Sequence, residues 1–117
     1  FDDTPCHRII ADFVVQCGDP TGTGTGGPGY SFADELPEAG EYEIGSIAMA
    51  NSGPDTNGSQ FFIITGENGA ALPPSYSLFG AVTEGFDETV VAMEAAGTAS
   101  GAPSEPVDIE SVVIITN

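Results

Sequence analysis

The chain has 117 residues and carries 18 acidic side chains against a single Lys or Arg, which gives a formal net charge of −17. Apolar residues make up 40% of the sequence, which excludes a disordered acidic tail and predicts a single domain over residues 1–117. A chain this negative would repel nucleic acid and anionic membranes, and because salt screens its self-repulsion, the composition favours the high-salt cytoplasm of a halophile over an ordinary acidic protein.

Short apolar segments rich in Ile, Val and Phe predict six strands, and none approaches the ~20 residues that span a membrane. In chain order the predicted strands are residues 4–10, 13–17, 44–50, 61–65, 78–82 and 107–116. Glycine, proline and polar residues predict loops over 21–29 and 51–60 and a loose linker over 97–106. Residues 87–96 predict the one good helix, with Asp87 suited to cap its start and Gly97 suited to its end. Short strands, one helix and long loops indicate an antiparallel barrel or sandwich.

The two cysteines, Cys6 and Cys17, are too few to form a disulfide framework. A bridge between them requires that their segments form an antiparallel pair. Small buried thiols are common in protein cores, so we expect two free buried cysteines.

Several familiar kinds of site are not indicated by the motifs. Residues 24–29 have the spacing of a dinucleotide loop, but no helix is predicted to follow, so a turned or flexible loop is expected. His7 is the only histidine and has no cysteine or carboxylate pair at metal-ligand spacing, so a structural role is expected and no metal or cofactor is predicted. No Ser or Cys is paired with a plausible base.

Arg8 is the only Lys or Arg in the chain and lies in an apolar stretch, where an unpaired charge is costly. Its retention points to the chemistry of the protein, although a buried structural cation paired with an acid is an alternative. Arginine, primary amides and an apolar pocket suit a reaction that makes and breaks no covalent bond. The residues concerned are Arg8, Gln16, Asn51, Gln60, Phe13, Val14, Phe62 and Leu72.

Three ordered blocks carry a family resemblance over nearly the whole chain. HRIIADFVVQCGDPTGTGTGGPGYSFADE, SIAMANSGPDTNGSQFFIIT and LFGAVTEGFDETV resemble the cyclophilin family of peptidyl-prolyl cis-trans isomerases. The resemblance implies a mainly β fold, a cyclophilin-like antiparallel β-barrel with a flanking helix. It also implies an enzyme that rotates Xaa-Pro peptide bonds in proline-containing peptides and folding proteins, and that needs no cofactor.

The resemblance also implies a role for individual residues. Arg8 matches the catalytic arginine, and Gln16 and Gln60 match the amides that hold this arginine and the peptide. The pocket for the substrate proline would be formed by Phe13, Val14, Phe62 and Leu72. Ala50 and Asn51 match the segment that binds the peptide backbone, Gly24 matches a glycine at the groove edge, and Tyr76 stands where many members have histidine.

The departures from the family pattern qualify these expectations. Val14 replaces a common methionine and Ala71 a bulky residue, which predicts a shallower wall and weaker affinity for cyclosporin-type ligands. Cys6 and Cys17 replace a usual phenylalanine and a usual glycine. Family members begin with two strands and a helix before the segment that matches Phe1, so the barrel is expected to be incomplete at its N-terminus. The alternatives to a catalyst are a non-catalytic module or chaperone that binds proline peptides and an inert fragment.

Overall fold

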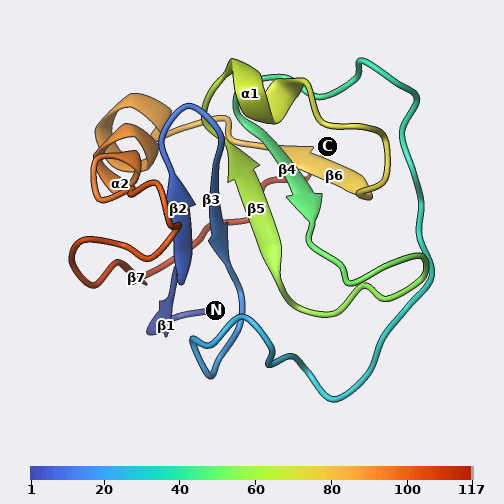
Figure 1. Cartoon of the computed structure of the whole chain (residues 1–117), viewed down its shortest axis with the longest axis horizontal. Coiled ribbons are helices and arrows are strands. Elements are labelled where there is room, and N and C mark those ends of the chain that lie inside the picture. The colour runs from blue at the N-terminus through green and yellow to red at the C-terminus, as the bar shows by residue number, and fades with distance from the viewer. Residues whose placement is uncertain (117) are drawn as a thin grey trace.

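The computed structural model describes residues 1–116 and is built mainly from antiparallel strands (Figure 1). The strands are β1 (Thr4–Pro5), β2 (Arg8–Ile10), β3 (Val14–Cys17), β4 (Ser46–Met49), β5 (Phe61–Ile64), β6 (Leu78–Ala81) and β7 (Asp108–Ile109). Five of them form one sheet in the order β2-β3-β5-β4-β6, and β1 pairs with β7 in a second sheet. The predicted mainly β, antiparallel fold is therefore confirmed.

The register of the five-stranded sheet aligns the polar and aromatic side chains of several strands. Arg8 on β2 lies opposite Gln16 on β3. Gln16 in turn lies opposite Phe62 on β5, and Phe62 lies opposite Ala48 on β4. Side chains of directly opposed residues lie on the same face of a sheet, so one row crosses four strands. A slip of one residue in any pair would move a member of this row to the other face.

The two faces of the sheet contribute to two apolar clusters. Residues next to one another on a strand point to opposite faces, so Val14 and Val15 belong to different clusters although both are buried. One cluster comprises Cys6, Ile9, Val15, Cys17, Ala96 and Ile109. The other comprises Val14, Tyr42, Ala48, Phe62 and Ile64, with partly buried residues such as Phe13, Leu72 and Tyr76 packed against it.

The helical segments differ from the predicted single helix. The chain forms η1 (Phe86–Val90), with π-helical hydrogen bonding, and continues directly into α2 (Val91–Glu94), which lies against β2 and β3. Gly85, with a φ of 84°, takes the position before the helix, and no side chain caps it, so the expected cap at Asp87 was wrong. A short helix, α1 (Glu67–Ala70), was not predicted.

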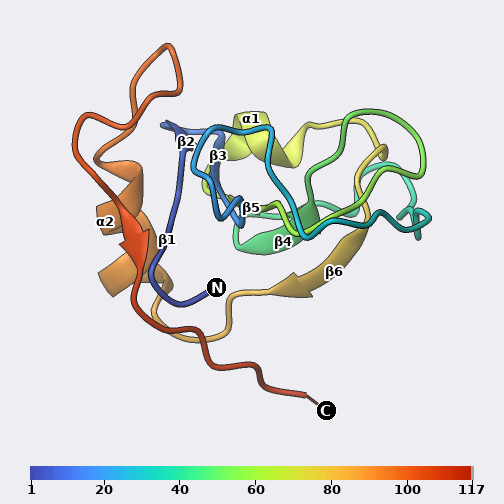
Figure 2. The ribbon, with the colours of Figure 1, turned by 90° about the horizontal axis from the view of Figure 1, so that it is seen from below.

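Two predicted strands differ most from the structure. Residues 4–10 divide into β1 and β2, which belong to different sheets, because Thr4 pairs with Ile109 whereas Arg8 pairs with Gln16. Of residues 107–116 only β7 has a strand partner among residues 1–116, and Figure 2 shows the segment after it leaving the body of the molecule. Val113 and Ile114 are consequently 83% and 78% exposed. An apolar run becomes a regular strand only where a neighbouring strand is available.

The cysteines form a disulfide, Cys6–Cys17, so the expectation of two free thiols was wrong. The β2–β3 register explains the bridge. Arg8 lies opposite Gln16, which brings the residue after Gln16 close to the segment that enters β2, and the two Cα atoms are 4.0 Å apart. Both cysteines are about 1% exposed and belong to one core cluster.

The long connections agree with the predicted loops. Residues 21–29 form turns and bends without strand or helix, and the whole segment from β3 to β4 runs around one side of the molecule (Figure 1).

Among residues 1–116, none of the helices has the length and apolar character required to cross a bilayer.

Candidate active site

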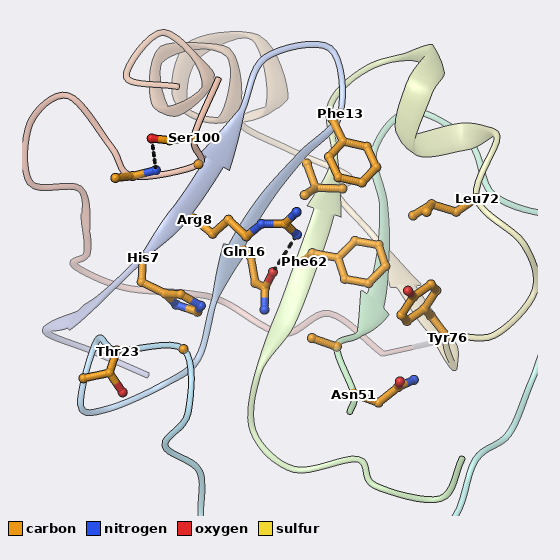
Figure 3. Close-up of a pocket in the computed structure, with 15 residues that line it drawn as sticks. His7, Arg8, Phe13, Gln16, Thr23, Asn51, Phe62, Leu72, Tyr76 and Ser100 are labelled. Carbon is orange, nitrogen blue, oxygen red and sulfur yellow. Dashed lines mark hydrogen bonds between the residues drawn. The ribbon is translucent and has the colours of Figure 1, made fainter. Parts of the chain in front are cut away.

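A pocket of about 460 Å³ opens where Arg8 and Gln16 meet the apolar cluster around Phe62 (Figure 3). Ten of the eleven predicted site residues line it: Arg8, Phe13, Val14, Gln16, Gly24, Ala50, Asn51, Phe62, Leu72 and Tyr76. The eleventh, Gln60, contacts the pocket indirectly, because its Oε1 accepts a hydrogen bond of 3.0 Å from Gln16 Nε2. The structure therefore gathers all of these residues in one place, and their roles remain predictions.

Arg8 lies in the pocket wall with most of its hydrogen-bonding capacity free. Its Nη1 donates to Gln16 Oε1 at 3.4 Å, and its Cζ is 5.7 Å from the centroid of the Phe13 ring, in range of a cation–π contact. A guanidinium has five N–H donors, so the others can serve a ligand. The alternative of a buried cation paired with an acid was wrong, because Arg8 is exposed and its partner is a neutral amide.

The opposite wall is apolar and preformed. Val14 and Phe62, which are 2% and 4% exposed, form its buried part. The ring of Phe62 meets that of Tyr76 edge to face, with centroids 5.4 Å apart and an interplanar angle of 87°. Phe13 and Leu72 are partly buried, pack against the same cluster and lie beside Phe62 (Figure 3). Such a wall can bury a small saturated ring.

Tyr76 is held from behind by Tyr42, a residue that was not among the predicted ones. The Tyr42 hydroxyl donates to the Tyr76 carbonyl oxygen at 2.5 Å and accepts from the Tyr76 N–H at 3.1 Å. Tyr42 is 3% exposed, and this burial raises the pKa of its hydroxyl, although the hydrogen bond to Tyr76 opposes the shift. The hydroxyl therefore stays protonated and can donate.

The side chain of Asn51 is held by backbone groups of neighbouring residues. Its Nδ2 donates to the Ser75 carbonyl at 2.9 Å, and its Oδ1 accepts from the Gly53 N–H at 3.2 Å. Among residues 1–116, no backbone acceptor is found for the Asn51 N–H, whereas Ala50 N–H donates to the Gln60 carbonyl at 3.0 Å. The Asn51 N–H is thus left without a backbone partner among these residues.

Five lining residues were not predicted: His7, Thr23, Ser100, Gly101 and Ala102. His7 was interpreted as structural, and residues 100–102 fall in the linker after the helix. Burial lowers the pKa of His7, Asp19 opposes this effect and Arg8 adds to it, so His7 is neutral at neutral pH. The linker is held by backbone hydrogen bonds, with Ile9 N–H donating to the Gly101 carbonyl at 2.8 Å. A signal for this contact is absent from the local sequence, because it joins segments about ninety residues apart in a linker without periodicity.

Ala71 lies outside the pocket lining and is exposed, at the C-terminal end of α1.

A second cavity of about 490 Å³ shares Gly24, Ala50 and Asn51 with the first pocket. Among residues 1–116, no Asp or Glu lines either cavity, although the chain carries 18 acidic residues. Within residues 1–116, no group of three or more His, Cys, Asp or Glu side chains is arranged to hold a metal ion.

Comparisons with known proteins agree with this geometry. The model of the family "Cyclophilin type peptidyl-prolyl cis-trans isomerase/CLD" matches residues 1–114. The chain is 47% identical over 117 residues to a probable peptidyl-prolyl cis-trans isomerase A of Mycobacterium leprae, covering 97% of this chain and 64% of the relative. It is 48% identical over 120 residues to peptidyl-prolyl cis-trans isomerase B of Streptomyces anulatus, covering 99% and 68%. The chain thus spans about two thirds of these relatives.

Among solved structures, a Cryptosporidium parvum cyclophilin type peptidyl-prolyl cis-trans isomerase is similar, with a TM-score of 0.85 and 38% identity. The match covers 100% of this chain and 76% of that one. A second structure of that protein, determined in the presence of the dipeptide Ala-Pro, gives a TM-score of 0.85 and 37% identity, and covers 100% and 77%.

Proposed function

The chain belongs to the cyclophilin-type peptidyl-prolyl cis-trans isomerase family, and we propose that it accelerates rotation of Xaa-Pro bonds in peptides and folding proteins. The observation that carries the proposal is the position of Arg8. Its guanidinium stands at the edge of an apolar pocket, beside Phe13 and Gln16, with N–H groups free to donate.

The barrier to be lowered is electronic. The peptide bond resists rotation by ~18–20 kcal/mol because the nitrogen lone pair is shared with the carbonyl. In the proposed complex, Phe13, Phe62 and Leu72 hold the proline ring while the acyl side turns. Arg8 donates to the prolyl nitrogen or to the neighbouring carbonyl and favours the twisted state, in which conjugation is lost.

In the proposed complex the main-chain N–H of Asn51, which has no backbone acceptor among residues 1–116, holds the rotating oxygen, and Ala50 and Gly24 lie beside it in the pocket lining. The Asn51 N–H and the Arg8 N–H groups are then the donors to the twisting bond, and donors that are in place before the bond twists need no reorganisation. They favour the twisted state over either planar isomer, which lowers the barrier rather than tightening ground-state binding. No proton transfer and no cofactor enters this mechanism.

The test is the cis-to-trans rate of a short Xaa-Pro peptide with and without the chain, in ~3 M KCl, where charge repulsion is screened. The wild-type chain is expected to accelerate the exchange. Arg8→Ala is expected to lower kcat roughly 100-fold, as loss of a transition-state donor does, with a far smaller change in peptide affinity. Arg8→Lys keeps the charge without the planar fork and should fall between the two. An equal loss of rate and affinity would make Arg8 only a binding residue.

The second candidate is a binding module or chaperone for proline peptides without catalysis, motivated by Val14 and Ala71, which stand where the family commonly has methionine and a bulky residue. Saturable peptide binding by the folded wild-type chain without any acceleration would establish it. The same two replacements lead us to propose weaker affinity for cyclosporin-type ligands. The net charge of −17 leads us to propose work in high salt and no nucleic-acid or membrane partner.

A further inference from the structure

Asp19 differs from the other acidic residues because it is completely buried. It is 0% exposed and, within residues 1–116, it is the only Asp or Glu in the buried class. Its role is therefore not hydration of the surface. Among residues 1–116, its hydrogen-bond partners are not cations but backbone and hydroxyl donors of the following loop.

Five donors of the loop after β3 surround the carboxylate. Oδ1 accepts from the N–H and the hydroxyl of Thr21, at 2.8 and 2.7 Å. Oδ2 accepts from the N–H groups of Gly24 and Gly26, at 2.7 and 3.0 Å, and from the Thr23 hydroxyl at 3.4 Å. Burial alone would raise the pKa of Asp19, but these hydrogen bonds outweigh it and hold the pKa well below its usual range. Asp19 is therefore ionised throughout the working pH range.

The same two glycines are bound on their other side by Gln60. Its Nε2 donates to the carbonyl oxygen of Gly24 at 2.9 Å and to that of Gly26 at 3.0 Å. The loop is thus held between the Asp19 carboxylate, which accepts from its N–H groups, and the Gln60 amide, which donates to its carbonyl groups.

This arrangement fixes the direction of a relay that ends at Arg8. A primary amide has one donor end and one acceptor end, so Gln60, with its Nε2 on two carbonyls, must turn its Oε1 away from them. That oxygen accepts from Gln16 Nε2 at 3.0 Å, which leaves Gln16 Oε1 to accept from Arg8 Nη1 at 3.4 Å. If Gln60 turned over, Gln16 would present its own N–H groups to the guanidinium.

We propose that Asp19 is a positioning residue for Arg8, which acts through the Gly24 and Gly26 peptide groups, Gln60 and Gln16 to keep an acceptor facing the guanidinium. The inference rests on the proposed function, in which Arg8 is the donor to the twisting bond. Asp19 itself does not line the pocket and is not expected to touch the peptide.

The first test is Asp19→Asn, which keeps the side-chain volume but places a donor where the loop N–H groups need an acceptor. We expect kcat to fall about tenfold, as for loss of one hydrogen bond to a charged group, with KM nearly unchanged. The chain has one arginine, so its Nε–H NMR signal is unambiguous and reports the guanidinium without reference to activity. This signal and the side-chain amide signals of Gln16 and Gln60 should all shift in Asp19→Asn.

A double-mutant cycle separates the relay from general support of the loop. Gln16→Leu removes the last link, so Asp19→Asn added to it should cause little further loss of kcat. Additive losses in the double variant would overturn the proposal, because Asp19 would then act by another route. A folded Asp19→Asn chain with unchanged arginine and amide signals would also overturn it.

A pair of glycine variants keeps the test decisive if Asp19→Asn does not fold. A Cβ at Gly26 would collide with Asp19 Oδ1 and lie 2.6 Å from Thr21 Oγ1, whereas a Cβ at Gly27 would meet nothing within 4 Å. Neither glycine has a positive φ, so backbone strain does not separate them. Gly26→Ala should shift the Arg8 signal and lower kcat, and Gly27→Ala should do neither. If the two variants show the same Arg8 signal and the same kcat, the relay is overturned. If the wild-type chain is inactive but Gly26→Ala shifts the Arg8 signal, only the proposed function is overturned.

Discussion

Reduction of the Cys6–Cys17 disulfide is expected to lower the free energy of unfolding by about 3 kcal/mol. The two cysteines are separated by 11 residues, and in the chain-entropy model closing a loop of this size removes about that much conformational freedom from the unfolded chain. Small domains are stable by only about 5–15 kcal/mol, so the loss is a large share. With a urea slope of about 1–3 kcal/mol per molar, the midpoint should fall by about 1–3 M.

The measurement is urea unfolding in ~3 M KCl, with and without a thiol reductant, with mass spectrometry to confirm the redox state. The double variant Cys6→Ala/Cys17→Ala is the matched control, because reductant should leave its midpoint unchanged. If the fully reduced wild-type chain unfolds at the same urea concentration as the oxidised one, the reasoning fails. The β2–β3 hairpin would then hold the two segments together in the unfolded ensemble without help from the bridge.

Three further results are expected. Burial lowers the pKa of His7, so below about pH 6.5 the unfolded chain takes up a proton that the folded chain resists. The urea midpoint should therefore decrease when the pH is lowered from about 7.5 to about 5.5, and it should decrease less in His7→Gln. Phe62→Ala removes a ring that is 4% exposed and should cost about 3–5 kcal/mol of stability and raise KM, whereas Phe62→Leu should cost less on both measures. Raising KCl from ~0.1 to ~3 M should raise the urea midpoint of a chain with net charge −17, and an unchanged midpoint would count against the high-salt proposal.

Local pattern was sufficient for the elements whose partners also have strong patterns. β3, β4 and β5 fall within predicted strands, because each is a short apolar run and all three pair with one another or with a hairpin neighbour. The register of β2, β3 and β5 then brings Arg8, Gln16 and Phe62 into one row. The pocket residues were predicted from the family resemblance, which identifies positions that periodicity alone does not distinguish.

Local pattern failed where a distant partner decides the structure. Residues 4–10 read as one strand, but nothing in them indicates that β1 pairs about a hundred residues away with β7. The disulfide has the same origin, since its formation depends on the β2–β3 register rather than on the spacing of the cysteines.

The missed helix α1 is explained by a close contact that the sequence does not reveal. Gly69 is a poor helix former, so Glu67–Ala70 gives little helical signal. A Cβ at Gly69 would collide with the Phe13 carbonyl oxygen, which shows how closely the helix backbone approaches the β2–β3 turn. The glycine is therefore explained by packing beside the pocket and not by helix propensity.

The linker contact at Gly101 gives a last prediction. Gly101 is buried, has a φ of 91°, and lies so close to Arg8 that a Cβ would be 3.0 Å from Arg8 Cγ. Gly101→Ala should therefore both strain the backbone and push the arginine stem away from Gln16. Gly40 is the matched control, because its φ is 84° and a Cβ there would meet nothing within 4 Å.

Both alanine variants should lose about 1–2 kcal/mol of stability from the left-handed backbone, measured by urea unfolding. Only Gly101→Ala should shift the NMR signal of the single arginine and lower kcat for an Xaa-Pro peptide. If the two variants differ in neither measure, the linker does not support Arg8. A difference confined to Gly101→Ala would mean that the donor at the pocket edge is held from both sides. Gln16 would then hold its guanidinium, and a glycine about ninety residues away would pack against its aliphatic stem.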